Sequence, residues 1–101
     1  MSQEITLEQL AELPGLTLLE FGADWCGYCQ AAQPLIAEAL RTRSDIRHIR
    51  IEDGKGKRLG RLFRVKLWPS LILLKDGTEL ARIVRPEDSA SIIRMLRQTK
   101  P

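Results

Sequence analysis

The sequence predicts an α/β domain in which helices flank a mixed β-sheet, and three observations support this class. The predicted elements run in the order helix, strand, helix, strand, helix, strand, strand, helix. The segments "LTLLEF" (16–21) and "SLILL" (70–74) are apolar at nearly every position, as is typical of strands buried on both faces. Asp76-Gly77 is a hairpin dipeptide, so the last two strands are expected to be antiparallel.

The first predicted helix begins at a capping box. Thr6 and Gln9 have the spacing at which each side chain bonds the other residue's backbone N–H. Pro14-Gly15 ends the helix before the first strand. Its apolar stripe consists of Ile5, Leu7, Leu10 and Leu13.

The longest predicted helix runs from Tyr28 to Arg41. Its apolar residues recur at helical spacing and are Ala32, Leu35, Ile36, Ala39 and Leu40. Pro34 removes one backbone donor inside this helix and is expected to kink it. The alternating segment 46–51 then predicts a strand.

The final third begins with the basic segment "KGKRLGRLFRVK" (55–66), which holds six basic residues and no acid. A helix there would place Leu59, Leu62 and Phe63 on one face and Lys57, Arg61 and Arg64 on the other. The second strand of the hairpin is expected over 79–84 and the closing helix over 87–99. Ile92, Ile93 and Leu96 are expected to face the core.

Length and composition predict one soluble globular domain over residues 1–101, since 101 residues with 44% hydrophobic content supply one core. The start "MSQEITLEQLAEL" does not resemble a secretory signal, so we expect a cytoplasmic protein, or a periplasmic one if a signal had been removed. No membrane association is expected. Because cytosolic thiols are kept reduced, a close cysteine pair there is more often catalytic or metal-binding than a staple.

The only two cysteines, Cys26 and Cys29, open the longest helix. A zinc site needs four ligands, and only His48 could join them, so we expect no metal. A structural disulfide would close a very small loop and remove little unfolded-state entropy. Two buried thiols that merely pack remain an alternative, but redox exchange explains the position best.

The helix start assigns different roles to the two thiols. Unpaired backbone N–H groups and the positive end of the helix dipole stabilise a thiolate at Cys26, which makes it the expected nucleophile. Cys29 lies one turn deeper and is expected to attack second, releasing product from a mixed disulfide.

Three features in this order resemble the thioredoxin family over nearly the whole chain: "WCGYC" after a strand, Pro34 five residues beyond Cys29, and "WPSLILLKDG". The resemblance implies a thioredoxin fold and a protein-disulfide reductase that uses no cofactor. It implies disulfide-containing protein substrates, and a reductase or small thiol as electron donor. It also implies a cis Pro69 against the cysteine pair and a hairpin turn at Gly77. The strand that precedes the first helix in many members is absent or very short here.

Glu20 is anomalous, because a carboxylate inside a buried strand is costly unless it is paired. The family carries an aspartate at this place, which is thought to help deprotonate the second cysteine. His48 falls where many thioredoxins have a lysine paired with that acid, so a Glu20–His48 proton relay is expected. The alternatives are a solvated Glu20 at a strand end and an ordinary exposed His48.

Three positions depart from the family pattern. Tyr28 replaces the usual proline between the cysteines, Trp68 is bulkier than the residue usual before the cis proline, and Arg85 stands where a glycine is frequent. These departures indicate an altered choice of partner, although Trp68 could simply pack and Arg85 could be a solvated strand end. The expected substrate-binding residues are Trp25, Gly27, Tyr28, Trp68, Pro69 and Arg85.

Two other classes of function are open. The net charge of +3 and the basic segment 55–66 would suit a nucleic-acid module, but aromatics are few and no recognition motif is present, so we expect no nucleic-acid partner. A redox-sensing or redox-inactive binding module could use the groove around Trp25, Trp68 and Pro69. A monomeric oxidoreductase is the reading we favour.

Overall fold

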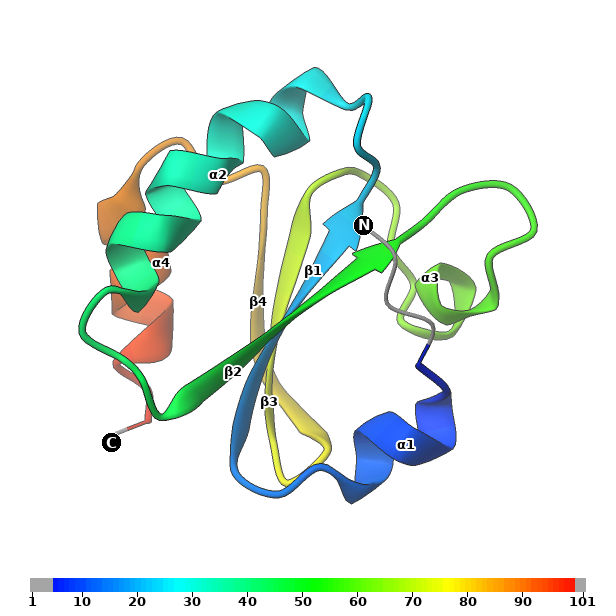
Figure 1. Ribbon diagram of the computed structural model, residues 1–101, viewed down its shortest axis with the longest axis horizontal. Helices are drawn as coiled ribbons and strands as arrows, with labels where there is room; N and C mark the ends of the chain where they lie inside the picture. Colours follow the sequence, from blue (N-terminus) through cyan, green and yellow to red (C-terminus); the bar gives the residue numbers. More distant parts are fainter. Residues whose placement is uncertain (1–4, 100–101) are drawn as a thin grey trace.

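The computed structural model describes residues 5–99, and its elements follow the predicted order. Helices and strands alternate until the final hairpin, which precedes the last helix (Figure 1). The elements are α1 (Leu7–Glu12), β1 (Leu16–Gly22), α2 (Gly27–Leu40), β2 (Ile46–Glu52), α3 (Arg58–Leu62), β3 (Ser70–Lys75), β4 (Thr78–Val84) and α4 (Ser89–Leu96). Within the described residues the chain begins with α1, and no strand precedes it.

The four strands of the described chain form one mixed sheet in the order β2-β1-β3-β4. β1 pairs with β2 in parallel and with β3 antiparallel, and β3 pairs with β4 antiparallel. Helices α2 and α4 lie on one side of the sheet, and α1 and α3 lie toward the other side (Figure 1). The prediction of a mixed sheet flanked by helices is therefore confirmed.

Both central strands are buried on both faces, which explains their nearly continuous apolar runs. Leu18 of β1 belongs to the core under α2 and α4, whereas its neighbour Leu19 belongs to the core under α1 and α3. Leu71 and Ile72 of β3 divide in the same way. Because side chains alternate along a strand, Glu20 shares the face of Leu18 and is directed toward α2.

Local signals set the ends of the elements. The capping box between Thr6 and Gln9 is present, with both reciprocal hydrogen bonds. Asp76 and Gly77 have φ of 49° and 81°, as the two central residues of a type I′ hairpin turn require. A Cβ on Gly77 would also collide with the backbone of Ala11, so this turn packs tightly against α1.

The prediction for the basic segment was partly wrong. Leu59 and Phe63 pack on the core, but Leu62 is 44% exposed. The reason is that α3 is a single short turn that ends at Leu62, and Arg64 then adopts a left-handed φ of 56°. Leu62 instead lines a pocket of about 210 Å³ with Leu7, which is also exposed.

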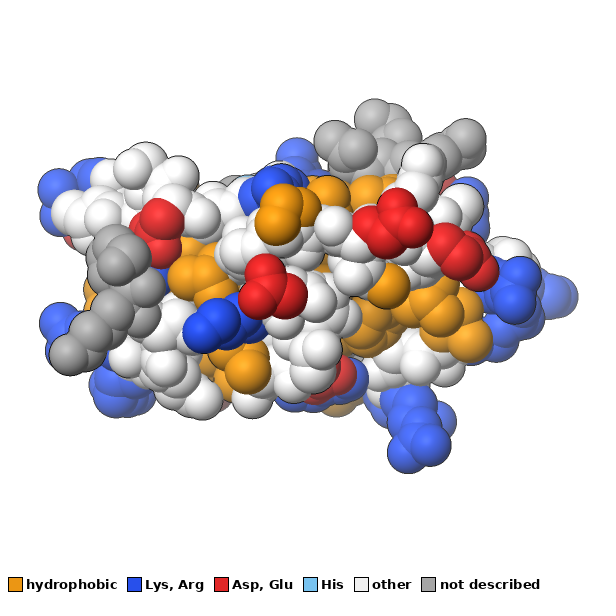
Figure 2. Space-filling model, turned by 90° about the horizontal axis from the view of Figure 1, so that it is seen from below, with side chains coloured by type: hydrophobic (Ala, Val, Ile, Leu, Met, Phe, Trp, Pro, Cys, Tyr) orange, Lys and Arg blue, Asp and Glu red, His pale blue; other side chains and the backbone are white. Residues whose placement is uncertain are grey.

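Figure 2 views the molecule from the end that carries α1 and shows hydrophobic side chains exposed there among charged ones.

The closing helix is shorter than expected: α4 begins after Asp88, whose carboxylate accepts from the backbone N–H of Ser91, and it ends at Leu96. Met95, which the periodicity analysis did not single out, is buried in this helix. No helix within residues 5–99 is long and apolar enough to cross a membrane.

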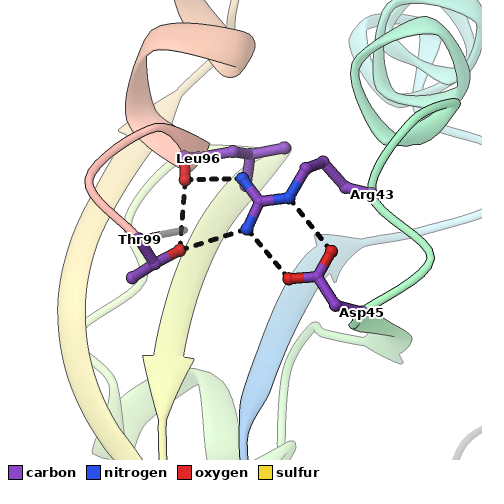
Figure 3. Close-up of polar contacts among 4 residues, drawn as sticks. All are labelled: Arg43, Asp45, Leu96 and Thr99. Atoms are coloured by element: carbon purple, nitrogen blue, oxygen red, sulfur yellow. Dashed lines mark hydrogen bonds and ion pairs between the residues drawn. The ribbon is translucent and has the colours of Figure 1, made fainter. Parts of the chain in front are cut away.

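Arg43 ties the connection between α2 and β2 to the end of α4 (Figure 3). Its guanidinium binds both carboxylate oxygens of Asp45, at 3.0 and 2.9 Å, and donates to the backbone carbonyl of Leu96 at 2.9 Å. It also contacts the hydroxyl of Thr99 at 3.5 Å. The planar guanidinium of Arg43 therefore joins these two segments, beyond the end of α2 that is opposite the cysteines.

Candidate active site

The cysteine pair lies where the chain leaves β1 and enters α2. Cys26 is the N-cap of α2, and its backbone N–H bonds the carbonyl of Ala23 at 3.1 Å. The Cys26 Sγ accepts a hydrogen bond from the backbone N–H of Cys29 at 3.2 Å. Cys26 is buried but more exposed than Cys29, at 7% against 2%, and it lies at the helix start, where backbone N–H groups are free.

Cys29 occupies a different environment one turn further along α2. It is only 2% exposed, and burial is the main reason that its pKa is raised to about 12. Hydrogen bonding to Cys26 and the negative charge of Glu20 raise the pKa of Cys29 further. The thiol of Cys29 therefore stays protonated at neutral pH until a partner removes its proton.

Glu20 is completely buried behind this pair, so the alternative of a solvated strand end is wrong. One carboxylate oxygen lies 2.8 Å from His48 Nε2, and the other accepts from Gln33 Nε2 at 2.6 Å. Among the described residues, no hydrogen bond joins Glu20 directly to the Cys29 thiol. Gln33 forms the link, because its amide also donates to the backbone carbonyl of Cys29 at 3.0 Å.

The parallel register of β1 and β2 brings basic groups to Glu20. His48 is opposite Leu18 and Arg50 is opposite Glu20, so both side chains are directed to the face that carries the buried acid. The side chain of His48 is 27% exposed and that of Arg50 is 41% exposed. Arg50 Nε lies 3.6 Å from the carboxylate. The expected Glu20–His48 contact is present, and it reaches from the buried carboxylate to the surface.

Gln33 and Arg50 were missed by the sequence analysis. Gln33 lies four residues after Cys29, one helical turn further along α2, and that spacing was the only available signal. Arg50 could be found only with the strand register, because a slip of one residue would direct it to the other face. Glutamine and arginine are so frequent on surfaces that neither residue type indicated a buried contact.

The Trp68-Pro69 peptide bond is cis, as the resemblance implied. Trp68 packs against the cluster that contains both cysteines, and its ring meets that of Trp25 edge to face at 5.4 Å. The indole N–H of Trp68 donates to Asp53 Oδ2 at 2.9 Å. A Cβ on Gly60 would collide with that same carboxylate, so Gly60 keeps the space that Asp53 needs.

Arg85 follows the end of β4 and is not a solvated strand end. Its Nε donates to the backbone carbonyl of Trp68 at 2.8 Å, and its guanidinium lies 3.9 Å from the centre of the Tyr28 ring. The side chain therefore bridges the loop before Pro69 and the first turn of α2.

The predicted substrate-binding residues thus surround the cysteine pair. Trp25 and Tyr28 are 77% and 61% exposed, and Gly27 is the first residue of α2 between them. Within residues 5–99, no three His, Cys, Asp or Glu side chains gather closely enough to hold a metal ion.

Comparison with known proteins identifies the family. The family model described as Thioredoxin matches residues 4–98. The chain belongs to the thioredoxin family. Thioredoxin 2 from Pseudomonas aeruginosa PAO1, in its reduced form, has a TM-score of 0.87 and 46% sequence identity to it, and the match covers 97% of this chain and 91% of that one.

Curated thioredoxins agree with this assignment. The thioredoxin of Chlamydia trachomatis is 30% identical over 96 residues, which are 95% of this chain and 92% of the relative. The thioredoxin of Mycobacterium tuberculosis is 33% identical over 85 residues, covering 83% and 73% of the two chains. This family member is a thiol–disulfide oxidoreductase of protein disulfides, and a redox-inactive binding module is not favoured.

Proposed function

We propose that this thioredoxin-family protein reduces protein disulfides with Cys26 as the attacking thiol and Cys29 as the resolving thiol. The contrast between the two sulfurs carries the proposal. Both cysteines are buried, but Cys26 is the more exposed, at 7% against 2%, and caps the helix N-terminus, whereas burial raises the pKa of Cys29 to about 12. An incoming disulfide is therefore expected to meet Cys26 before Cys29.

The proposed cycle balances in two steps. The Cys26 thiolate attacks one sulfur of the substrate disulfide, the S–S bond breaks, and the other substrate sulfur leaves as a thiolate. Cys29 then loses its proton and attacks Cys26 Sγ, which releases the second substrate sulfur and leaves a Cys26–Cys29 disulfide. The substrate gains two electrons, and the protein dithiol is oxidised.

Glu20 is proposed to accept the proton of Cys29 in the second step, and His48 to pass it to the surface. The support is the buried carboxylate behind Cys29 together with its 2.8 Å contact to a partly exposed imidazole. Gln33 acts as a positioning residue, because it holds both the carboxylate and the turn that carries Cys29.

The proposed cycle also needs an electron donor and a reducing compartment. A reductase or a small thiol would return electrons to the Cys26–Cys29 disulfide, which fits a compartment where thiols are kept reduced. We therefore propose a cytoplasmic, monomeric reductant with no nucleic-acid partner and no cofactor beyond its own thiols.

The test separates the two thiols. Cys26→Ser is expected to abolish the acceleration of insulin reduction by dithiothreitol, and Cys29→Ser is expected to accumulate a mixed disulfide that intact-protein mass spectrometry detects. A mixed disulfide that forms only in the Cys26→Ser variant would reverse the assignment. An acceleration above the rate of dithiothreitol alone that persists in both variants would refute the cycle.

A further inference from the structure

The three positions that depart from the family pattern form one connected cluster. Arg85 contacts the ring of Tyr28 and the backbone carbonyl of Trp68. Tyr28 lies between the two cysteines in the sequence, and Trp68 packs against the cluster that contains them. Three separate departures therefore alter the same part of the surface, directly beside the redox pair.

Arg85 is held in place by one backbone hydrogen bond and two contacts of its guanidinium. The backbone of Arg85 has a left-handed φ of 50°, and its N–H bonds the carbonyl of Pro69 at 2.9 Å. Its Nε is fixed by the carbonyl of Trp68 at 2.8 Å, and the planar group lies over the Tyr28 ring at 3.9 Å. Little side-chain entropy is left to lose when this group binds a ligand.

The charge of Arg85 is not neutralised within residues 5–99. Arg43 and Arg82 each bind a carboxylate through two nitrogens, to Asp45 and Glu79 respectively. Arg85 has no acidic partner among the described residues, and only its Nε is used in a hydrogen bond. The two terminal nitrogens therefore keep donors in the fork geometry that matches a carboxylate.

We propose that Arg85 is a specificity-determining residue that binds a carboxylate beside the disulfide being reduced. The preferred substrates of the proposed reduction would then carry an acidic side chain next to the attacked cysteine. The exposed rings of Trp25 and Tyr28 would contact the apolar part of the same peptide segment. This inference rests on the proposed function and names its substrate class.

The experiment uses three peptides with one intramolecular disulfide, which differ only in Glu, Gln or Lys beside the attacked cysteine. The reduced protein is mixed with each peptide, and single-turnover rates are followed by tryptophan fluorescence, with insulin reduction measured in parallel. The Glu peptide is expected to react about fivefold to tenfold faster than the Gln peptide, the factor for one charge-assisted hydrogen bond at a partly solvated site, and the Lys peptide slowest. The preference is expected to shrink at high salt.

Variants identify the group responsible. Arg85→Gln is expected to bring the ratio of the Glu-peptide rate to the Gln-peptide rate close to one, and Arg85→Lys to keep only part of that ratio, because an ammonium lacks the planar fork. Arg41→Gln is the matched control, since it removes the same charge at the opposite end of α2 and is expected to keep the preference. Equal rates for all three peptides, or a preference that survives in Arg85→Gln, would overturn the inference alone. Failure of the wild type to reduce either peptides or insulin would overturn the proposed function itself.

Discussion

Replacing Glu20 by glutamine tests whether the buried carboxylate takes the proton of Cys29. With a pKa of about 12, the free Cys29 thiolate costs about 7 kcal/mol at pH 7, at about 1.4 kcal/mol per pH unit. The part of this pKa increase that comes from Cys26 disappears in the mixed disulfide, because Cys26 carries no charge there. Burial remains as the largest cause, so an acceptor for the proton is still needed.

The variant is expected to slow the resolving step about 100-fold near pH 7, at the low end for general base catalysis. The low end applies because Gln33, and not the thiol itself, contacts the carboxylate. Without the base, the rate should follow the free thiolate and rise about tenfold per pH unit, so the deficit should shrink in alkali. Glutamine keeps the shape of Glu20 and can still accept from Gln33.

The measurement is rapid acid quench of the mixed disulfide between pH 5.5 and 9, with Glu38→Gln as control. Glu38 is an exposed acid on α2, the helix that carries Cys29, so its replacement removes an equal charge without touching the site. The direction of the change in the resolving rate shows whether Glu20 acts as a base. The negative charge of Glu20 also raises the pKa of Cys29. If Glu20 does not act as a base, the resolving step of Glu20→Gln should therefore be as fast as that of the wild type, or faster, at every pH.

Two further predictions concern stability. Gly60→Ala is expected to lower the free energy of unfolding by about 1–3 kcal/mol in urea titrations, because the new Cβ collides with Asp53, and to change the fluorescence of Trp68 by disturbing its hydrogen bond. An unchanged urea midpoint would contradict this packing argument. The hydrogen bond from the backbone of Ser91 lowers the pKa of Asp88 from its usual value, so its stabilising contribution is present above the unfolded-state pKa and is lost as the pH falls through the lower, folded-state value. Asp88→Asn keeps a cap acceptor that does not titrate in this range, so its urea midpoint should fall less than that of the wild type between pH 5 and pH 2, and an equal fall would show that other groups cause the acid loss.

The sequence by itself determined the order of the elements, the hairpin at Asp76-Gly77 and the place of the cysteines at a helix start. These features depend on residues close together in the chain, through periodicity, capping and turn geometry. The sequence favoured a buried Glu20, because an apolar run without alternation predicts a strand covered on both faces, but it left a solvated strand end open. The chemistry of Cys26 could therefore be predicted before any contact was known.

Only the tertiary structure decided what surrounds that chemistry. The contact of Glu20 with His48 required the parallel register of β1 and β2, which a slip of one residue would have destroyed. The contact of Arg85 with Tyr28 joins β4 to α2 across 57 positions of sequence. The exposure of Leu62 depended on where a very short helix stops. Such contacts arise from the packing of separate elements, and a pattern read along the chain carries no information about the side chain that will lie opposite.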